Sequence, residues 1–318
     1  MIGLPLVYLL AGLMFAAFAG LSAADRDNAK RFGNAAFWGL FAVSFLFGDR
    51  LGDLGNGVLA LLLAVIAGAG RLGLGAPRTT TDETREALAT RHGPRLFIPA
   101  LVIPVMVLAG SLVLKRLTIH GAPLADPKQA TLISLAFAAI VAAILASVMF
   151  RQPPSAPIQE GRRLMDLVGW AALLPQMLAA LGAVFALAGV GKSVGELAVM
   201  ITPVDSRFAA VAAYCVGMAA FTAMMGNAFA AFPVMTGGIA LPLVIGRFHG
   251  DPAVVCAIGM LSGFCGTLLT PLAANFNLVP AALLRLKDRY AVIRAQAPTA
   301  FVMLALNVAL MNLLAFHR

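Results

Sequence analysis

The chain has 318 residues, of which 61% are hydrophobic and only 12% are charged, and its mean hydropathy is +0.92. This composition excludes a soluble domain with a wet surface and indicates a polytopic membrane protein that contacts lipid. The net charge of +9 does not indicate a nucleic-acid partner, because the 23 Lys and Arg residues lie almost entirely in short gaps between apolar runs. In such gaps positive charge sets membrane topology.

Apolar runs predict an all-α protein with about ten membrane passes, since a helix needs about 20 residues to cross the hydrocarbon. The runs lie near residues 2–23, 34–48, 54–73, 96–114, 129–150, 164–190, 207–225, 229–246, 253–283 and 297–315. The first run lacks the positive region of a cleavable signal, so we expect it to be a membrane helix. The run 253–283 is longer than one straight span requires, which indicates a broken or re-entrant element.

The connections between these runs predict topology and domains. If they alternate across the membrane, fifteen basic residues fall on one side and eight on the other. By the positive-inside rule the fifteen face the cytoplasm, and both termini lie outside. The proline-rich stretch within 151–163 predicts a cytoplasmic linker between scaffold and assembly helices (1–150) and a transport-type region (164–318).

Residues 188–195 match parts of two enzyme motifs. Gly191-Lys192-Ser193 ends like a phosphate-binding loop, but Ala186 stands where that loop needs glycine and no strand precedes it. Gly191 to Gly195 also fits the nucleophile elbow, which needs a strand-turn-helix setting and a histidine base. Because neither context is present, we expect no catalytic residue and no enzyme activity. A membrane hydrolase using Ser193 is the alternative that Ser193→Ala would test.

A re-entrant helical hairpin is the prediction for residues 189–205. Gly189, Gly191 and Gly195 permit a tight turn between two short arms, and Ser193 can cap the second arm. A helix N-terminus there would present free N–H groups to an anion. An ordinary external loop explains the same residues equally well, because glycine-rich turns connect membrane spans in general.

A second interrupted element is predicted at residues 224–238, a stretch that contains no charge and includes Thr236. Gly226-Asn227 is a turn signal and Pro233 removes a helix hydrogen bond, so the segment can unwind twice. As an alternative, Gly226-Asn227 merely joins two spans at the cytoplasmic face. We favour a site role because another interrupted element follows, and paired broken helices indicate the centre of a transporter.

That further element is residues 263–277, where glycines, a proline, two threonines and two asparagines lie in a region without charge between Asp251 and Arg285. In lipid an unpaired backbone group costs several kcal/mol. We therefore expect a discontinuous helix whose freed backbone groups and neutral side chains face a polar ligand. Packing between helices through Ser, Thr and Asn is the alternative for one or two of these residues.

Together these stretches predict a neutral substrate site without metal-ligand acids. The candidate substrate-binding residues are Gly191, Ser193, Gly226, Asn227, Pro233, Thr236, Gly266, Thr267, Thr270, Pro271, Asn275 and Asn277. Carboxylates inside the apolar runs are scarce, and Asp166 is expected to cap the start of a helix. We expect no organic cofactor, and Na⁺ near Asn227, Thr270 and Asn275, or alternatively H⁺, as the coupling ion.

Residues 225–234 and 266–277 carry a resemblance that covers nearly the whole chain. They are similar to the C-terminal half of transporters of the ion-transporter superfamily. More narrowly, the chain resembles the larger subunit of a bacterial two-component family, long described as a domain of unknown function and associated with 5-oxoproline (pyroglutamate) transport. The resemblance implies a multi-pass protein of the bacterial inner membrane, an elevator motion, a smaller membrane subunit that supplies the other inverted repeat, and a dimeric assembly.

The substrate implied by this resemblance suits the neutral residues. 5-Oxoproline presents one carboxylate and one lactam, which match a helix N-terminus and threonine and asparagine groups better than an arginine clamp. Another small mono- or dicarboxylate would fit equally well. The competing class is a membrane enzyme or assembly subunit that transports nothing and whose polar stretches only pack helices.

Overall fold

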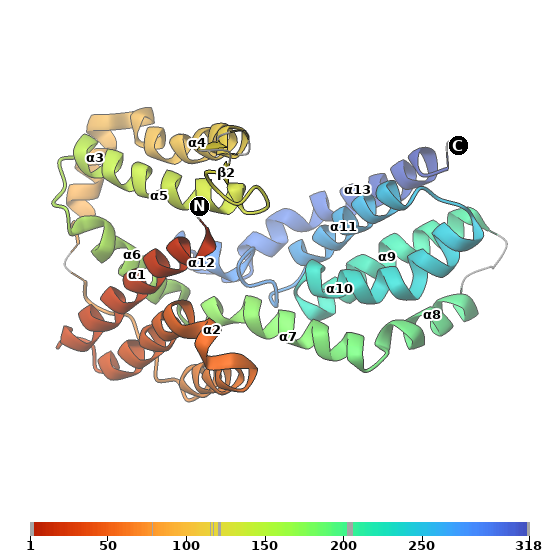
Figure 1. Cartoon of the computed structure of the whole chain (residues 1–318), viewed down its shortest axis with the longest axis horizontal. Helices are drawn as coiled ribbons and strands as arrows, with labels where there is room; N and C mark the ends of the chain where they lie inside the picture. Colours follow the sequence, from red (N-terminus) through yellow and green to blue (C-terminus); the bar gives the residue numbers. More distant parts are fainter. Residues whose placement is uncertain are drawn as a thin grey trace. The chain divides into compact units, whose positions relative to one another are not determined.

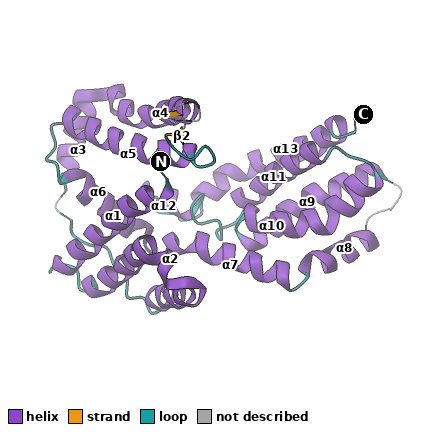
Figure 2. Cartoon of the chain, viewed as in Figure 1, coloured by secondary structure: helices purple, strands orange, loops and turns teal. Residues whose placement is uncertain are grey.

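The computed structural model describes residues 3–77, 79–114, 116, 118–119, 122–201 and 206–316 (Figure 1). These residues are almost entirely helical (Figure 2), apart from a short antiparallel pair of strands, β1 (Thr118–Ile119) and β2 (Ala122–Pro123). The chain divides into two compact units, Met1–Gly169 and Trp170–Arg318, which we call the N-terminal unit and the C-terminal unit.

The N-terminal unit is built from two helix pairs, α1 with α2 and α4 with α5, and from α6, which packs against α1 and α5. Its helices are α1 (Leu4–Ala24), α2 (Arg31–Gly68), α3 (Asp82–His92), η1 (Gly93–Phe97), α4 (Ile98–Leu114), α5 (Ala130–Met149) and α6 (Ala156–Val168).

Helix α2 turns back on itself at Gly52, whose φ of 62° favours glycine. Gly33 near its start lies against the backbone of Arg71 just beyond its end, so the two halves run antiparallel. The side-chain amide of Asn56 donates to the carbonyls of Gly48 and Gly52, both at 2.9 Å, and so closes the end of the first half. Two separate apolar runs of the sequence thus form one doubled element.

The chain is a multi-pass membrane protein. Eight of the described helices are long and apolar enough to cross a membrane, counting the doubled α2 once. A further apolar helix, α11 (Pro252–Leu268), has 17 residues and is shorter than the usual span. The prediction of ten passes is not decided by these lengths and stays a prediction.

The linker predicted at 151–163 is shorter in the structure. Helix α6 begins at Ala156, with Pro157 in its first turn, and packs against α1, so only 151–155 can act as a connection. The chain divides into its two compact units after Gly169, so α6 belongs to the N-terminal unit. Asp166 lies near the end of α6 and does not cap its start, so that prediction was wrong.

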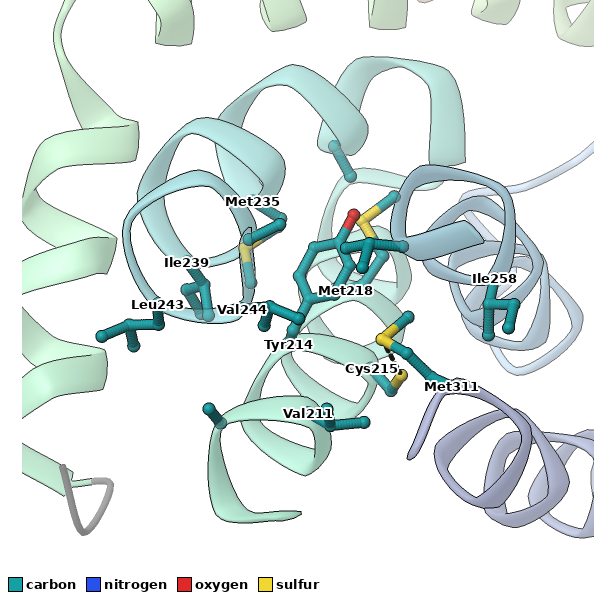
Figure 3. Packing of buried hydrophobic residues seen from close by; sticks show 14 of the residues in the cluster. Val211, Tyr214, Cys215, Met218, Met235, Ile239, Leu243, Val244, Ile258 and Met311 are labelled. Carbon is teal, nitrogen blue, oxygen red and sulfur yellow. Dashed lines mark hydrogen bonds between the residues drawn. The ribbon is translucent and has the colours of Figure 1, made fainter. Parts of the chain in front are cut away.

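The C-terminal unit places α9, α11, α13 and the combined helix α10–η3 side by side (Figure 1). Its elements after the η2 turn (Gly169–Leu173) are α7 (Leu174–Leu187), α8 (Val190–Ile201), α9 (Arg207–Met225), α10 (Ala228–Met235), the π-helix η3 (Thr236–Arg247), α11, α12 (Leu278–Leu283) and α13 (Ala291–Leu314). Figure 3 shows its apolar core, which includes Tyr214 and Met218 of α9 and Met235 of α10, and in which Cys215 of α9 contacts Met311 of α13.

The hairpin predicted at 189–205 is absent from its described part, residues 189–201. Helix α8 runs without a break through the other two glycines of that prediction, and the turn lies before it, at Gly189 with a φ of 69°. The remaining residues, 202–205, lie outside the described part of the chain. Ser193 lies inside α8 on an exposed face and caps no helix.

Helices α7 and α8 lie one after the other along α10–η3 and run parallel to it. Gly182 of α7 lies against Ala230, and Gly195 of α8 lies against Gly238, so higher residue numbers meet higher residue numbers. A hairpin that turned back would reverse this order. The glycines of α8 therefore serve close helix packing, because a Cβ on Gly195 would stand only 2.5 Å from the carbonyl oxygen of Gly238.

Helix α10 continues into η3, giving an unbroken 20-residue element from Ala228 to Arg247. The second unwinding predicted at Pro233 does not occur, since Pro233 lies inside α10 and the helix widens to π geometry only from Thr236. The predicted turn at Gly226-Asn227 is present, and it joins two helices that are each long enough to span a membrane.

Candidate functional site

A small cavity of about 190 Å³ lies at one end of the C-terminal unit, where the α9–α10 turn, the end of α11 and the start of α7 meet. We call it the broken-helix pocket. Its lining residues are Pro175, Leu178, Gly226, Asn227, Ala228, Phe229, Phe264, Thr267, Asn275 and Phe276. The structure thus brings together four of the twelve predicted site residues, Gly226, Asn227, Thr267 and Asn275.

The turn at Gly226-Asn227 presents a helix N-terminus to this pocket. Gly226 has a φ of 74° and donates its N–H to the carbonyl of Thr222, while a Cβ on it would meet the Leu272 backbone at 2.7 Å. The side-chain oxygen of Asn227 accepts the Phe229 N–H at 2.9 Å and caps α10. The positive end of a 20-residue helix therefore faces the cavity.

The break predicted in the last polar stretch is confirmed in the backbone. Helix α11 ends at Leu268, and the chain is non-helical from 269 to 277, where α12 follows. The side-chain amide of Asn277 donates to the carbonyls of Thr267 and Thr270 at 2.8 and 2.7 Å. Asn277 therefore pairs the carbonyls that the break sets free.

Burial separates the two asparagines of this break. Asn277 is 0% exposed and is absent from the lining of the pocket, whereas Asn275 is exposed and lines it. Asn277 was predicted to bind substrate, and the structure instead places it behind the broken backbone as an internal cap. Its carbonyl oxygen Oδ1 has no hydrogen-bond partner among the described residues.

Apolar groups form most of the pocket wall, and none of the described residues that line it is charged. Phe229 and Phe264 meet edge to face with ring centroids 5.8 Å apart. Sequence reasoning missed these rings and Pro175 and Leu178 as site residues. The available signal was an aromatic residue within three positions of each polar one, as in Asn275-Phe276.

Two predicted residues line a different cavity. Gly191 and Pro233 belong to a groove of about 790 Å³ between α8 and α10–η3, which Lys192 and Glu196 also line. The predicted set of site residues thus includes some that lie outside the broken-helix pocket. In sequence, a glycine or proline that allows close helix packing cannot be distinguished from one that bends a helix toward a ligand.

The other predicted residues have contacts away from the pocket. Thr236 is buried, and its hydroxyl pairs with that of Tyr214 at 3.0 Å. Gly266 packs directly on the backbone of Ala219. The Thr270 hydroxyl accepts the Leu272 N–H at 3.2 Å, while Pro271 and Ser193 are exposed.

The sodium site predicted at Asn227, Thr270 and Asn275 has two of its three members in one pocket, because Asn227 and Asn275 line it and Thr270 does not. Among the described residues there is no group of three or more His, Cys, Asp or Glu side chains that could hold a metal ion. A cation bound at this pocket would thus take neutral oxygens as ligands.

Comparison with known proteins gives one match. A family model described as "Protein of unknown function (DUF979)" covers residues 5–316 of the chain. No curated protein and no solved structure matches it. The matched region runs through both units and contains every residue of the broken-helix pocket.

Proposed function

The chain belongs to the DUF979 family of proteins of unknown function, and we propose that it is the site-bearing subunit of a secondary transporter for a small organic anion. The observation that carries this proposal is the broken-helix pocket. In a multi-pass membrane protein, it joins a helix N-terminus, a helix break and neutral polar side chains in one small cavity. Substrate sites of transporters are typically built from such interrupted helices.

The pocket favours a small monoanion over a cationic or large ligand. Its 190 Å³ is below the range of about 300–1,000 Å³ that holds drug-sized ligands. The N-terminus of α10 offers partial positive charge, and no fixed charge among the described lining residues has to be desolvated. Phe229, Phe264 and Phe276 offer apolar surface to the carbon skeleton of the ligand.

Within this class, 5-oxoproline is our proposed substrate. Its carboxylate would meet the N–H groups at the start of α10, and its lactam would meet Thr267 and the Asn275 amide. Other small mono- or dicarboxylates share the carboxylate and are the alternative substrates. The substrate rests on the resemblance of the sequence, whereas the preference for a small anion rests on the pocket.

The resemblance also carries the remaining parts of the proposal. A smaller membrane subunit would supply the second half of the site, the C-terminal unit would move as a body during alternating access, and Na⁺ or H⁺ would drive uptake in the bacterial inner membrane. A pocket of ten residues from one chain is compatible with a site that a partner completes.

The direct experiment is uptake of labelled 5-oxoproline into proteoliposomes that contain this chain, with and without the smaller subunit. We expect uptake that depends on an ion gradient and that unlabelled 5-oxoproline suppresses. A folded complex that takes up other small carboxylates but not 5-oxoproline would overturn the substrate. A complex that takes up no anion under either gradient would overturn transport and favour an assembly subunit.

A charge placed at the pocket tests the site separately. Asn227→Asp keeps an oxygen that caps α10 but adds a negative charge beside the expected carboxylate, so uptake should fall more than tenfold while the melting temperature changes little. The matched control is Ser206→Asp, because Ser206 caps α9 in the same way outside the pocket lining. Equal uptake by both variants would show that the pocket does not bind the anion.

A further inference from the structure

A buried ionic cluster in the N-terminal unit lies outside the proposed substrate site. Asp25 follows the last residue of α1, and Arg162 and Asp166 stand one turn apart on α6. Arg162 forms an ion pair with Asp25, and its Nε lies 3.6 Å from Oδ2 of Asp166. The side chains are almost fully buried: Asp25 is 4% exposed, Arg162 3% and Asp166 2%.

Neighbouring donors hold one oxygen of each carboxylate. The indole N–H of Trp38 donates to Oδ1 of Asp166 at 3.0 Å, and the Asn34 amide donates to the same oxygen at 3.2 Å. The backbone N–H of Ala76 donates to Oδ2 of Asp25 at 2.8 Å. By contrast, Oδ2 of Asp166 and Nε of Arg162 make no well-aligned hydrogen bond among the described residues, and the nearest backbone to that oxygen is that of Gly75.

With both carboxylates ionised the cluster has a net negative charge, because two carboxylates share one guanidinium. The half-buried charged groups nearby have other contacts, because Glu160 pairs with Arg163 and Arg31 lies over the Phe32 ring. The remaining charged groups on the adjoining segments are Arg26, Asp27, Lys30 and Arg71, and all four side chains are exposed to solvent or headgroups. They balance the buried charge only weakly, because exposed charges are screened. A buried carboxylate without its own cation gains most from binding a proton.

The two carboxylates are not equivalent. Burial raises the pKa of Asp25, but the Ala76 amide and Arg162 outweigh this effect and hold that pKa below its ordinary value. Asp25 thus stays ionised and keeps its ion pair with Arg162. Asp166 has the longer contact to Arg162 and the oxygen without a well-aligned hydrogen bond, and it is the member with room for a proton.

A cavity borders the Asp25–Arg162 ion pair, although Asp166 itself does not line it. Asp25 and Arg162 both line a cavity of about 460 Å³, together with Gln159 and the exposed residues Arg26 and Asp27. This end of the unit is rich in basic residues, so the positive-inside rule assigns it to the cytoplasm. Water in the cavity would reach the ion pair from that side.

We propose that Asp166 is a proton-binding site of this chain. A proton arriving from cytoplasmic water binds to Oδ2 of Asp166, which becomes neutral, while Arg162 keeps its ion pair with Asp25. The contact between Arg162 and Asp166 within α6 is then lost, while the Arg162–Asp25 pair still joins α6 to the end of α1, and release of the proton restores the lost contact. A role for this site in coupling or in pH control of uptake rests on the proposed function, whereas the protonation itself does not.

Trp38 provides a reporter that needs no transport assay. The chain has two tryptophans: Trp38 is 1% exposed and bonded to Asp166, and Trp170 is 50% exposed. In the full chain carrying Trp170→Phe, purified in detergent, the emission of Trp38 should change in a single transition as the pH is lowered. Asp166→Asn should abolish this transition, whereas Asp53→Asn, an exposed acid of α2, should leave it unchanged.

Asp25→Asn gives a second test, which predicts the direction of a pH shift in a chain that retains Asp166. It removes a neighbouring negative charge and frees Arg162 for Asp166, so the midpoint should move to lower pH by about one unit. A transition that persists in Asp166→Asn, or no transition in the parent chain, would overturn the proposal. A change in emission driven by Na⁺ at constant pH would also overturn it in favour of a metal cation. The fluorescence results do not depend on transport, so a failure to take up 5-oxoproline would count only against the proposed function.

Discussion

Replacing Asn277 and Asn275 in turn tests how the broken helix is held and where it binds. These residues stand two positions apart and have the same side chain. Asn277 is fully buried and donates to the carbonyls of Thr267 and Thr270, whereas Asn275 is exposed and makes no side-chain hydrogen bond to the described residues. The first should therefore govern stability and the second ligand binding.

The magnitude follows from the two carbonyls. Asn277→Ala leaves both without donors in a buried setting, at about 1–3 kcal/mol each, or about 2–6 kcal/mol in total. With about 2 °C per kcal/mol, the melting temperature in detergent should fall by about 4–12 °C. Asn277→Asp should be worse than Asn277→Ala, because it places a carboxylate oxygen against the two carbonyls. Asn275→Ala should change stability by less than about 0.5 kcal/mol.

Thermal unfolding and binding of labelled 5-oxoproline are measured on the same preparations. We expect Asn275→Ala to bind at least fivefold more weakly with an unchanged melting temperature, and Asn277→Ala to melt early. An Asn277→Ala chain as stable as the parent would refute the internal cap. Unchanged binding by Asn275→Ala would remove it from the site.

Two further predictions concern packing and pH. Gly195→Ala should lower the melting temperature, because its Cβ would stand 2.5 Å from the Gly238 carbonyl, at a cost of about 1–3 kcal/mol, whereas Gly237→Ala has open space and should be neutral or stabilising. Equal melting of the two variants would refute the close packing of α8. The lowered pKa of Asp25 means that its charge stabilises the fold above the unfolded pKa of about 3.9, and that this stability is lost as the pH falls through the folded pKa. Asp25→Asn should therefore melt lower than the parent at pH 7, with a difference that shrinks on acidification; a constant difference would contradict this assignment.

Local chemistry was enough to predict part of the site. Polar residues and Pro271 in an apolar run cannot continue a membrane helix without partners, so the break after Leu268 was foreseeable. The turn at Gly226-Asn227 was equally visible, because an αL glycine followed by a capping asparagine specifies it within two residues. Both features depend on neighbours in sequence.

The sequence by itself determined that this is a multi-pass membrane protein whose polar breaks lie in its C-terminal half, because hydropathy and turn chemistry are local properties. Only the tertiary structure decided which polar residues share a cavity. Gly195 packs on Gly238, Trp38 donates to Asp166, and Arg162 pairs with Asp25, across separations of 43, 128 and 137 residues. A glycine that bends a helix and one that lets two helices touch look alike in sequence, and so do a buried and an exposed asparagine. Their roles are set by the partner that the fold brings to them.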